Sequence, residues 1–225
     1  MEAEYRYEKK FLVESCALAD IMQAVRRHPA MFSEIYPPRF VNNIYLDSPL
    51  LGDYFSNVNG YAQRGKVRVR WYHRLFRTVN DAVLEYKIKD GEVGRKQQFP
   101  FPFFTLQAGF CEQDFHKRIK RSPLPESVRR NLQDLEFSVL NRYKRWYFAT
   151  PDRRFRLTVD HNPTYYRLSK LHNQFLSRWI DRIHIIVELK YAVQDDVDAH
   201  RITTRLPFRI TRSSKYVTGV DWVYL

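Results

Sequence analysis

The chain of 225 residues carries a formal net charge of +13, with 44% hydrophobic and 16% aromatic residues. This length and composition favour one folded domain, and the charge favours an anionic partner: nucleic acid, an acidic membrane surface or phosphates. The two distant cysteines, Cys16 and Cys111, argue against a disulfide scaffold, and no apolar run approaches the length of a transmembrane segment. We therefore expect a cytoplasmic protein that reaches a membrane only through a membrane-protein partner, if at all.

Alternating charged and apolar side chains predict strands throughout the N-terminal half. The expected strands cover residues 1–11, 40–47, 66–72, 83–89 and 94–99. Helical spacing at 15–28 predicts a helix that stops before Pro29, and a short helix to about residue 57 follows the break at Ser48-Pro49.

Prolines interrupt residues 101–136, where helical spacing replaces the alternation. Residues 125–135 resemble a helix capped by Ser122, and the segment is too short for a core of its own. We expect a helical insertion within a single domain that spans residues 1–225. Strands are expected again at 140–148, 154–160 and 183–191, followed by helices at about 196–205 and after Ser213. Residues 165–179 are aromatic and basic, and follow neither period.

Strand after strand carries one strongly charged face. The pattern predicts an α+β fold whose eight strands are enough to close an antiparallel sheet into a barrel. In such a barrel the charged face of each strand lies either on the outer surface or in the interior. A wet outer face explains any single strand equally well. The interior is favoured because Arg and Lys dominate and the opposite faces are apolar enough to pack against helices. The charged faces are Arg6/Glu8/Lys10, Lys66/Arg68/Arg70, Glu85/Lys87, Lys96/Gln98, Tyr143/Arg145, Arg156/Thr158/Asp160 and Glu188/Lys190.

A cationic interior requires an anionic ligand. Two cations about 7 Å apart repel by roughly 2.4 kcal/mol at an effective dielectric constant of about 20. Several such pairs would rival the stability of a whole domain, about 5–15 kcal/mol. Phosphate chains suit such an interior, because Arg binds their oxygens at two points and Lys supplies point charges. The few carboxylates, Glu8, Glu85, Asp160 and Glu188, suit a hard divalent cation that bridges phosphate oxygens.

Eight short motifs occur in the order expected of a VTC domain, which this sequence resembles over nearly its whole length. They are YRYEKKF (5–11), NIYLD (43–47), KVRVR (66–70), LEYK (84–87), YKR (143–145), RLTVD (156–160), VELKY (187–191) and SKY (214–216). VTC domains are the catalytic domains of the vacuolar polyphosphate polymerase, within the CYTH-like triphosphate tunnel metalloenzymes. The resemblance implies an eight-stranded antiparallel tunnel with helices packed outside. It also implies binding of ATP or inorganic triphosphate and polyphosphate together with a divalent metal, Mn or Mg.

The resemblance assigns roles by motif position. The residues expected to act on the transferred phosphate are Lys10, Arg68, Arg70, Lys87, Arg145, Arg156 and Lys215. Further phosphate contacts are expected from Lys66, Lys96, Tyr143, Ser214 and Arg212. Glu188 matches the metal ligand, and Glu8, Glu85 and Asp160 are the other candidate ligands. Such a domain moves the γ-phosphate of ATP onto a polyphosphate chain, which requires mostly positioning and charge neutralisation.

Two positions depart from the family pattern. Hydrolytic relatives carry Glu-x-Glu-x-Lys in the first strand, where this chain has Arg6, Glu8 and Lys10. The loss of one carboxylate weakens a second metal site and favours the polymerase branch. Arg212 replaces a usual Lys, which leaves specificity at that end of the tunnel open.

Alternatives to the polymerase are a hydrolase of triphosphate or short polyphosphate and a module that binds polyphosphate or RNA without turnover. Nucleic acid is the less favoured ligand. The chain has neither a P-loop nor a Rossmann glycine motif. Tyr165, Tyr166 and Trp179 could stack on an adenine, but packing within the protein is favoured.

Overall fold

The computed structural model describes residues 5–14 and 16–225, so the start of the first predicted strand and Ser15 lie outside the described part. Its strands are β1 (Arg6–Val13), β2 (Ser33–Asp47), β3 (Gln63–Tyr72), β4 (Arg77–Val79), β5 (Val83–Asp90), β6 (Val93–Pro100), β7 (Phe104–Leu106), β8 (Glu136–Ala149), β9 (Arg156–Arg167), β10 (Arg178–Ile180) and β11 (Ile185–Ala192). Its helices are α1 (Leu18–Arg26), α2 (Gly52–Val58), α3 (Glu112–Lys120), α4 (Glu126–Gln133), α5 (Asp196–Thr203) and α6 (Lys215–Tyr224), with a 3-10 turn at Val193–Asp195.

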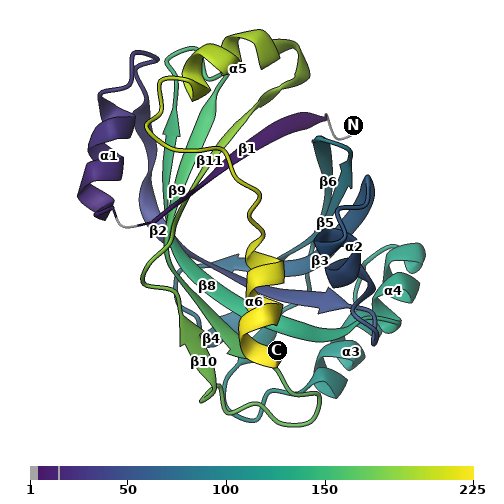
Figure 1. Ribbon diagram of the computed structural model, residues 1–225. Coiled ribbons are helices and arrows are strands. Elements are labelled where there is room, and N and C mark those ends of the chain that lie inside the picture. Colours follow the sequence, from purple (N-terminus) through teal and green to yellow (C-terminus); the bar gives the residue numbers. More distant parts are fainter. Residues whose placement is uncertain (1–4, 15) are drawn as a thin grey trace.

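Eight strands of the described chain close into a ring (Figure 1). The order is β1, β6, β5, β3, β2, β8, β9, β11 and back to β1, and all neighbours are antiparallel. The shortest strand pairing is that of β1 with β6, where Arg6 pairs with Gly94 and Tyr7 with Val93. Strand β10 extends the sheet beside β9, and β4 and β7 form a separate pair. The predicted α+β fold with an eight-stranded antiparallel tunnel is confirmed.

The segment between β6 and β8, which contains β7, α3 and α4, covers the apolar face of β3. Val69 and Trp71 of β3 are completely buried there, and the Trp71 ring packs edge-on against Phe104 of β7 at a centroid distance of 5.5 Å. Phe115 of α3 belongs to the same core. Burying one such side chain fully contributes about 1.5–3 kcal/mol. This segment therefore serves as the outer cover of one side of the ring.

A second outer core lies beneath α1 and α5. Phe11 of β1 and Val187 of β11 are completely buried in it, together with Ile21 of α1 and Ile202 of α5. Successive side chains of a strand point to opposite faces. Because the apolar residues of β1 and β11 face these outer helices, the charged residues between them face the inside of the ring.

Helix α6 lies on the inner side of the ring (Figure 1), unlike the helices of the two outer cores. Tyr216 of α6 stacks on Tyr45 with ring centroids 4.9 Å apart, and Tyr45 pairs in the sheet with Arg68, on the charged face. Gly219 permits this close approach, because a Cβ at that position would lie 2.6 Å from the Tyr165 ring. A helix was expected here, but its place inside the ring was not.

Several predicted boundaries need correction. Strand β2 begins at Ser33, well before residue 40, because register shifts around Tyr36 accommodate two prolines that usually interrupt strands. The predicted cap Ser122 is wrong: its hydroxyl donates to the Ile119 carbonyl at the end of α3 (2.7 Å), and Pro125 precedes α4. Residues 165–179 contain the end of β9 and the start of β10.

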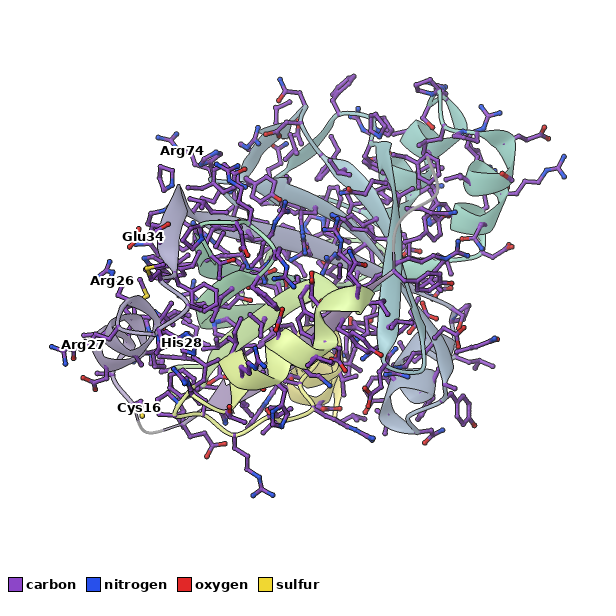
Figure 2. All side chains as sticks on the ribbon, turned by 90° about the horizontal axis from the view of Figure 1, so that it is seen from above. Cys16, Arg26, Arg27, His28, Glu34 and Arg74 are labelled. Atoms are coloured by element: carbon purple, nitrogen blue, oxygen red, sulfur yellow. The ribbon has the colours of Figure 1, made fainter. Side chains whose placement is uncertain are left out.

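Exposed charged side chains lie on the surface around α1. Figure 2 labels Arg26 of α1 and Glu34 of β2, whose side chains form an exposed ion pair at 2.5 Å. Cys16 is exposed and Cys111 is half-buried, and both thiols are free. The expectation that the chain has no disulfide framework therefore holds for the described residues.

Candidate active site

Three neighbouring strands, β3, β5 and β6, build the first group of interior charges, which we call the Glu85 cluster: Arg68, Arg70, Glu85, Lys96 and Gln98. Arg68 binds the Glu85 carboxylate at two points, through Nε at 2.7 Å and Nη2 at 2.6 Å. Arg70 Nη1 lies 3.5 Å away, and Gln98 Nε2 donates to the other oxygen at 2.8 Å. Burial favours a neutral carboxyl, but Arg68, Arg70 and Lys96 outweigh it and hold the pKa of Glu85 well below its usual range.

Polar side chains of β2 and β8 fix the orientation of these arginines. Arg70 Nε donates to Asn43 Oδ1 at 2.8 Å, and Asn43 in turn donates to Asn141 Oδ1 at 2.8 Å. Arg68 Nη1 donates to the Tyr45 hydroxyl at 3.2 Å. Both guanidinium groups are therefore held by partners on two strands, which leaves little rotational freedom.

The second group, the Asp160 cluster, consists of Lys10, Arg145, Asp160, Glu188 and Lys215. Arg145 binds Asp160 at two points, 2.5 and 2.6 Å, and its Nη2 lies 3.3 Å from Glu188. Lys215 of α6 lies 2.5 Å from Asp160 and 3.2 Å from Glu188. Burial disfavours the charged forms, but the opposite charges outweigh it, lowering the pKa of Glu188 and raising that of Lys215.

Glu8 of β1 forms a third group of interior charges with lysines of β1, β5 and β11. Its carboxylate lies 2.9 Å from Lys87 of β5, 3.2 Å from Lys10 and 3.5 Å from Lys190 of β11. Burial alone would raise the pKa of Glu8. The three lysines outweigh this effect and hold the pKa well below its usual range, so the carboxyl stays ionised. Burial also lowers the pKa of the Lys87 ammonium to about 8, despite Glu8. An incoming anion would raise this pKa again, because it stabilises the charged ammonium.

The N-terminus of α6 meets β3 at one end of the interior. The Ser214 hydroxyl accepts a hydrogen bond from Lys66 at 2.7 Å and caps the helix by accepting from the Val217 amide at 3.2 Å. Burial, with Lys10 and Lys87 nearby, holds the pKa of Lys66 well below its usual range. Lys66 therefore lies in a positively charged setting, where a bound phosphate would be stabilised.

The remaining predicted phosphate contacts differ in burial. Tyr143 is buried, with Lys215 4.8 Å and Arg145 5.2 Å from its ring centre. The Lys96 side chain is 56% exposed. Arg156, opposite Lys190 in the sheet, and Arg212, close to Gly60, are both exposed and lie outside the two clusters.

The four candidate metal ligands do not form one group. Glu85 is enclosed by the arginines of its cluster, and Asp160 by Arg145 and Lys215. Among residues 5–14 and 16–225, no three His, Cys, Asp or Glu side chains lie close enough together to hold a metal ion. Any divalent cation would therefore depend on one or two carboxylates together with phosphate oxygens.

Sequence reasoning left several interior residues out of the site. Lys190 and Gln98 lie on the charged faces of β11 and β6. Each is two residues from a predicted site residue, Glu188 or Lys96, and this spacing could have identified it. The Thr158 hydroxyl, opposite Glu188, is buried without a hydrogen-bond partner in the described chain. No sequence signal distinguishes such a hydroxyl from an ordinary strand residue.

The aromatic residues considered for adenine stacking pack within the protein. Tyr165 stacks on Trp179 with centroids 5.8 Å apart, and Trp179 stacks on Trp222 of α6 at 4.1 Å. Tyr166 is buried on the outer face of β9. These contacts attach α6 to β9 and β10.

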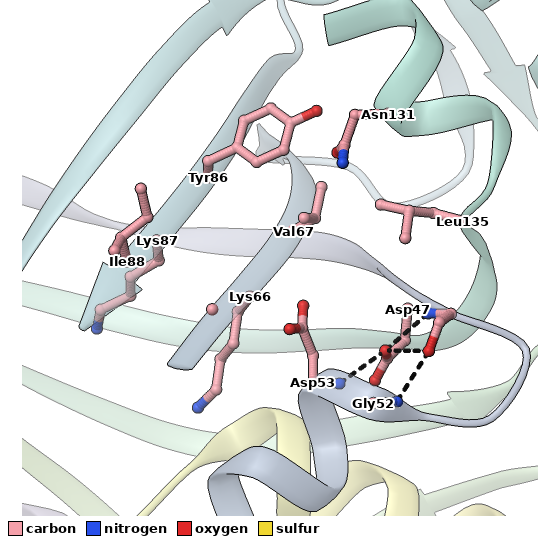
Figure 3. A pocket seen from close by; sticks show the side chains of 12 residues that line it. Asp47, Gly52, Asp53, Lys66, Val67, Tyr86, Lys87, Ile88, Asn131 and Leu135 are labelled. Carbon is pink, nitrogen blue, oxygen red and sulfur yellow. Dashed lines mark hydrogen bonds between the residues drawn. The ribbon is translucent and has the colours of Figure 1, made fainter. Parts of the chain in front are cut away.

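A cavity of about 330 Å³ borders the Lys66 end of the interior, between α2, α4 and strands β3 and β5 (Figure 3). Asp53 of α2 lies in it, and burial together with the nearby Asp47 raises the pKa of Asp53 to about 6. Asp47 itself accepts hydrogen bonds from the Ser48, Asp53 and Tyr54 amides at 2.7–2.9 Å and from the Tyr216 hydroxyl. It therefore joins α2 and α6 to the end of β2.

No helix in the described part of the chain is long and apolar enough to span a membrane.

Comparisons with known proteins agree with this architecture. The model of the VTC domain family matches residues 5–224. The fold is similar to that of a conserved hypothetical protein from Pyrococcus furiosus, with a TM-score of 0.54, 14% identity, and coverage of 94% of this chain and 99% of that chain. It is also similar to a protein from Hippeastrum that is assigned as an adenylyl cyclase and described as having a dominant triphosphatase activity. That likeness has a TM-score of 0.51 and 10% identity, and covers 99% of this chain and 97% of that chain.

A protein from Bacillus halodurans assigned as an adenylate cyclase gives a TM-score of 0.52 at 12% identity, with coverage of 95% of this chain and 96% of that chain. No curated protein sequence matches the chain. At such low identities the structural likeness shows a shared fold. The family match over nearly the whole chain, on a closed ring of eight strands with a charged interior, shows that this chain belongs to the VTC domain family, within the CYTH-like triphosphate tunnel fold.

Proposed function

We propose that this chain is a metal-dependent phosphotransferase that moves the γ-phosphate of ATP onto a polyphosphate chain inside the tunnel. The observation that carries the proposal is the composition of the interior, where basic side chains outnumber the carboxylates Glu8, Glu85, Asp160 and Glu188. The basic side chains are Lys10, Lys66, Arg68, Arg70, Lys87, Lys96, Arg145, Lys190 and Lys215. A linear chain of phosphates balances such an excess along its whole length.

The interior arginines are positioned before substrate arrives. Glu85 holds Arg68 at two points, and Asp160 holds Arg145 in the same way. Guanidinium groups fixed in this manner need little reorganisation when charge develops on a transferred phosphate, which is the main contribution a protein makes to phosphoryl transfer. The lysines have flexible stems, so they can follow phosphate oxygens while the arginines fix the register of the chain.

Glu8 and Glu188 are the carboxylates that best fit a divalent cation. Both border Lys10, at 3.2 and 3.8 Å, and both are kept ionised by the surrounding lysines. The unpartnered Thr158 hydroxyl opposite Glu188 adds an oxygen donor. Hard oxygen donors suit Mn²⁺ or Mg²⁺, which bind phosphates with few protein ligands. When bound, such an ion would neutralise charge on the reacting phosphates.

Two reactions in this tunnel differ only in the acceptor. Transfer to a phosphate chain is preferred because Arg6, two residues before Glu8 on β1, stands where hydrolytic relatives have a carboxylate. An arginine attracts an anionic acceptor, whereas a carboxylate would support a second metal and activate water. Hydrolysis of triphosphate is the competing reaction, and triphosphatase activity is described for the Hippeastrum protein of the same fold.

The test is to incubate the purified protein with ATP and MnCl₂, with and without a short polyphosphate primer, and to measure acid-insoluble phosphate polymer. We expect polymer that is abolished by EDTA. Arg68→Ala should reduce the rate at least about tenfold, because a charge-assisted contact to phosphate contributes about 1.5–3 kcal/mol. Lys117→Ala, an exposed lysine on α3, is the matched control and should keep full activity.

Tripolyphosphate in place of ATP distinguishes the two reactions. Release of free phosphate without polymer formation, lost in Glu188→Gln, would replace the polymerase by a hydrolase. The absence of both activities, in protein whose melting temperature rises with tripolyphosphate, would leave a binding module and overturn the proposed transfer.

A further inference from the structure

A second cavity, of about 300 Å³, lies outside the tunnel. Its lining residues are Phe40, Arg142, Asn162, Thr164, Tyr166, Arg178, Ile180 and Arg182. Thr164 and Tyr166 alternate along β9 with Tyr165, whose ring packs against α6 on the inner side. Arg142 pairs with Thr164, on the same face. This cavity, which we call the outer arginine pocket, therefore opens on the opposite side of β8 and β9 from the Asp160 cluster.

Arg142 forms the inner part of the outer arginine pocket. Its guanidinium packs on the Phe40 ring, 3.8 Å from the ring centre. The Nε atom is buried and has no hydrogen-bond partner among the described residues. Burial lowers the pKa of Arg142, and the nearby Tyr166 offsets this only in part. A buried donor without an acceptor is destabilising, so it marks a place where an acceptor is expected.

Arg178 and Arg182 add two exposed guanidinium groups from β10 and the turn after it. The pocket lining contains no Asp or Glu, and neither arginine forms an ion pair within the described residues. The adjacent Asp181 is buried and committed to His184, whose Nδ1 lies 2.9 Å from its carboxylate, and to the Ile183 and His184 amides. Three positive charges in the outer arginine pocket thus remain uncompensated.

We propose that the outer arginine pocket binds a small phosphoanion carrying two linked phosphates, independently of the tunnel. Guanidinium groups match phosphate oxygens at two points each, and three of them balance the charge of a pyrophosphate unit better than that of a carboxylate. The Thr164 hydroxyl in the lining supplies a further donor. Free pyrophosphate and the phosphates of a nucleoside diphosphate share this chemistry, and the aromatic and aliphatic lining is compatible with either.

The test is NMR of the arginine Nε–Hε groups during titration of the full chain with pyrophosphate, and separately with ADP. Single arginine variants assign the signals of Arg142, Arg178 and Arg182 apart from those of Arg68, Arg70 and Arg145 in the tunnel. We expect the three outer signals to shift together and to saturate with pyrophosphate. The titration reports on the tunnel and on the outer arginine pocket separately. If the signals of the tunnel arginines did not shift, the result would count against the proposed function and not against this site.

The variant Arg178→Ala/Arg182→Ala should weaken pyrophosphate binding at Arg142 at least about tenfold, because each charge-assisted contact contributes about that factor. Both residues are exposed, so folding is not at risk. Arg121→Ala/Arg201→Ala, which removes two exposed charges elsewhere, should leave this affinity unchanged. Shifts of the outer signals with ADP alone would support the site and identify a nucleoside diphosphate as its ligand. Outer signals that stay fixed in both pyrophosphate and ADP, or an affinity that falls equally in both double variants, would overturn the proposal.

Discussion

The two clusters that make up most of the tunnel lining are assembled in different ways. In the Glu85 cluster, Arg68 and Glu85 are 17 residues apart and directly opposite each other on hydrogen-bonded strands. In the Asp160 cluster, Lys215 comes from α6, 27 residues beyond Glu188, and reaches the sheet only when that helix docks inside the ring. The central ion pair of the first cluster forms when β3 and β5 pair, whereas the second cluster requires a separate packing event. We therefore expect the Asp160 cluster to be the more sensitive to change.

The largest effect is expected from Asp160→Ala. Asp160 is completely buried and is the shared partner of Arg145 and Lys215. Its removal leaves two buried cations with only Glu188 between them, and breaking a buried ion pair costs about 3–5 kcal/mol. Chemical denaturation measures the loss. Tripolyphosphate should recover part of it, since phosphate oxygens can replace the carboxylate.

Asp114→Ala, which removes an exposed ion pair on α3, is the control and should leave the denaturation midpoint nearly unchanged. If Asp160→Ala behaved like this control, the Asp160 cluster would not depend on its central carboxylate.

The next effect concerns the docking of α6. In Gly219→Ala the new methyl group would lie 2.6 Å from the buried Tyr165 ring, so the helix or the ring has to move. Overpacking of this kind destabilises by about 1–3 kcal/mol. Because Lys215 moves with α6, tripolyphosphate affinity should fall as well, and calorimetry measures it. Thr218→Ala on the same helix is the control, and an equal loss in both variants would mean that the close contact at Gly219 is unimportant.

A smaller, pH-dependent effect is expected at the α2 end. The pKa of Asp53 is about 6 in the folded protein, against an ordinary value of 3.8. Between these values the folded state retains a proton that the unfolded state has released, so the carboxyl reduces stability progressively as the pH rises, and the penalty is constant above 6. The stability gain of Asp53→Asn over wild type should therefore grow from about pH 4 to pH 6 and then level off. Thermal melts across this range would contradict the prediction if the gain shrank as the pH rose.

The smallest effect is expected at the exposed side of the Glu85 cluster. The Lys96 side chain is 56% exposed and lies 3.8 Å from Glu85, so solvent screens it. Lys96→Ala should weaken tripolyphosphate binding by less than about fivefold, which corresponds to about 1 kcal/mol. Arg70→Ala, in the buried part of the same cluster, should weaken it more. Equal losses of affinity in the two variants would indicate that the contribution of these cations to binding does not depend on their burial.

Much of the tunnel could be predicted because a period of two is a local property. Alternation in β3 and β5 placed Arg68 and Glu85 on one face, and their register brings them together without help from other elements. The boundaries that failed have local causes too: the prolines of β2 concealed a strand whose bulges accommodate them, and Ser122 caps no helix because α3 ends at that point.

By itself, the sequence determined the strand alternation, the excess of basic side chains and the order of motifs, because these depend on neighbouring residues. Only the tertiary structure decided which carboxylate pairs with which cation, since Glu8 of β1 contacts Lys87 of β5 and Lys215 contacts Asp160 through a docked helix. It alone also decided that Arg142, Arg178 and Arg182 line one pocket on the outer face. Such contacts join distant segments, and they form only when burial of the apolar faces and of the aromatic contacts of α6 offsets the entropy of closing those loops.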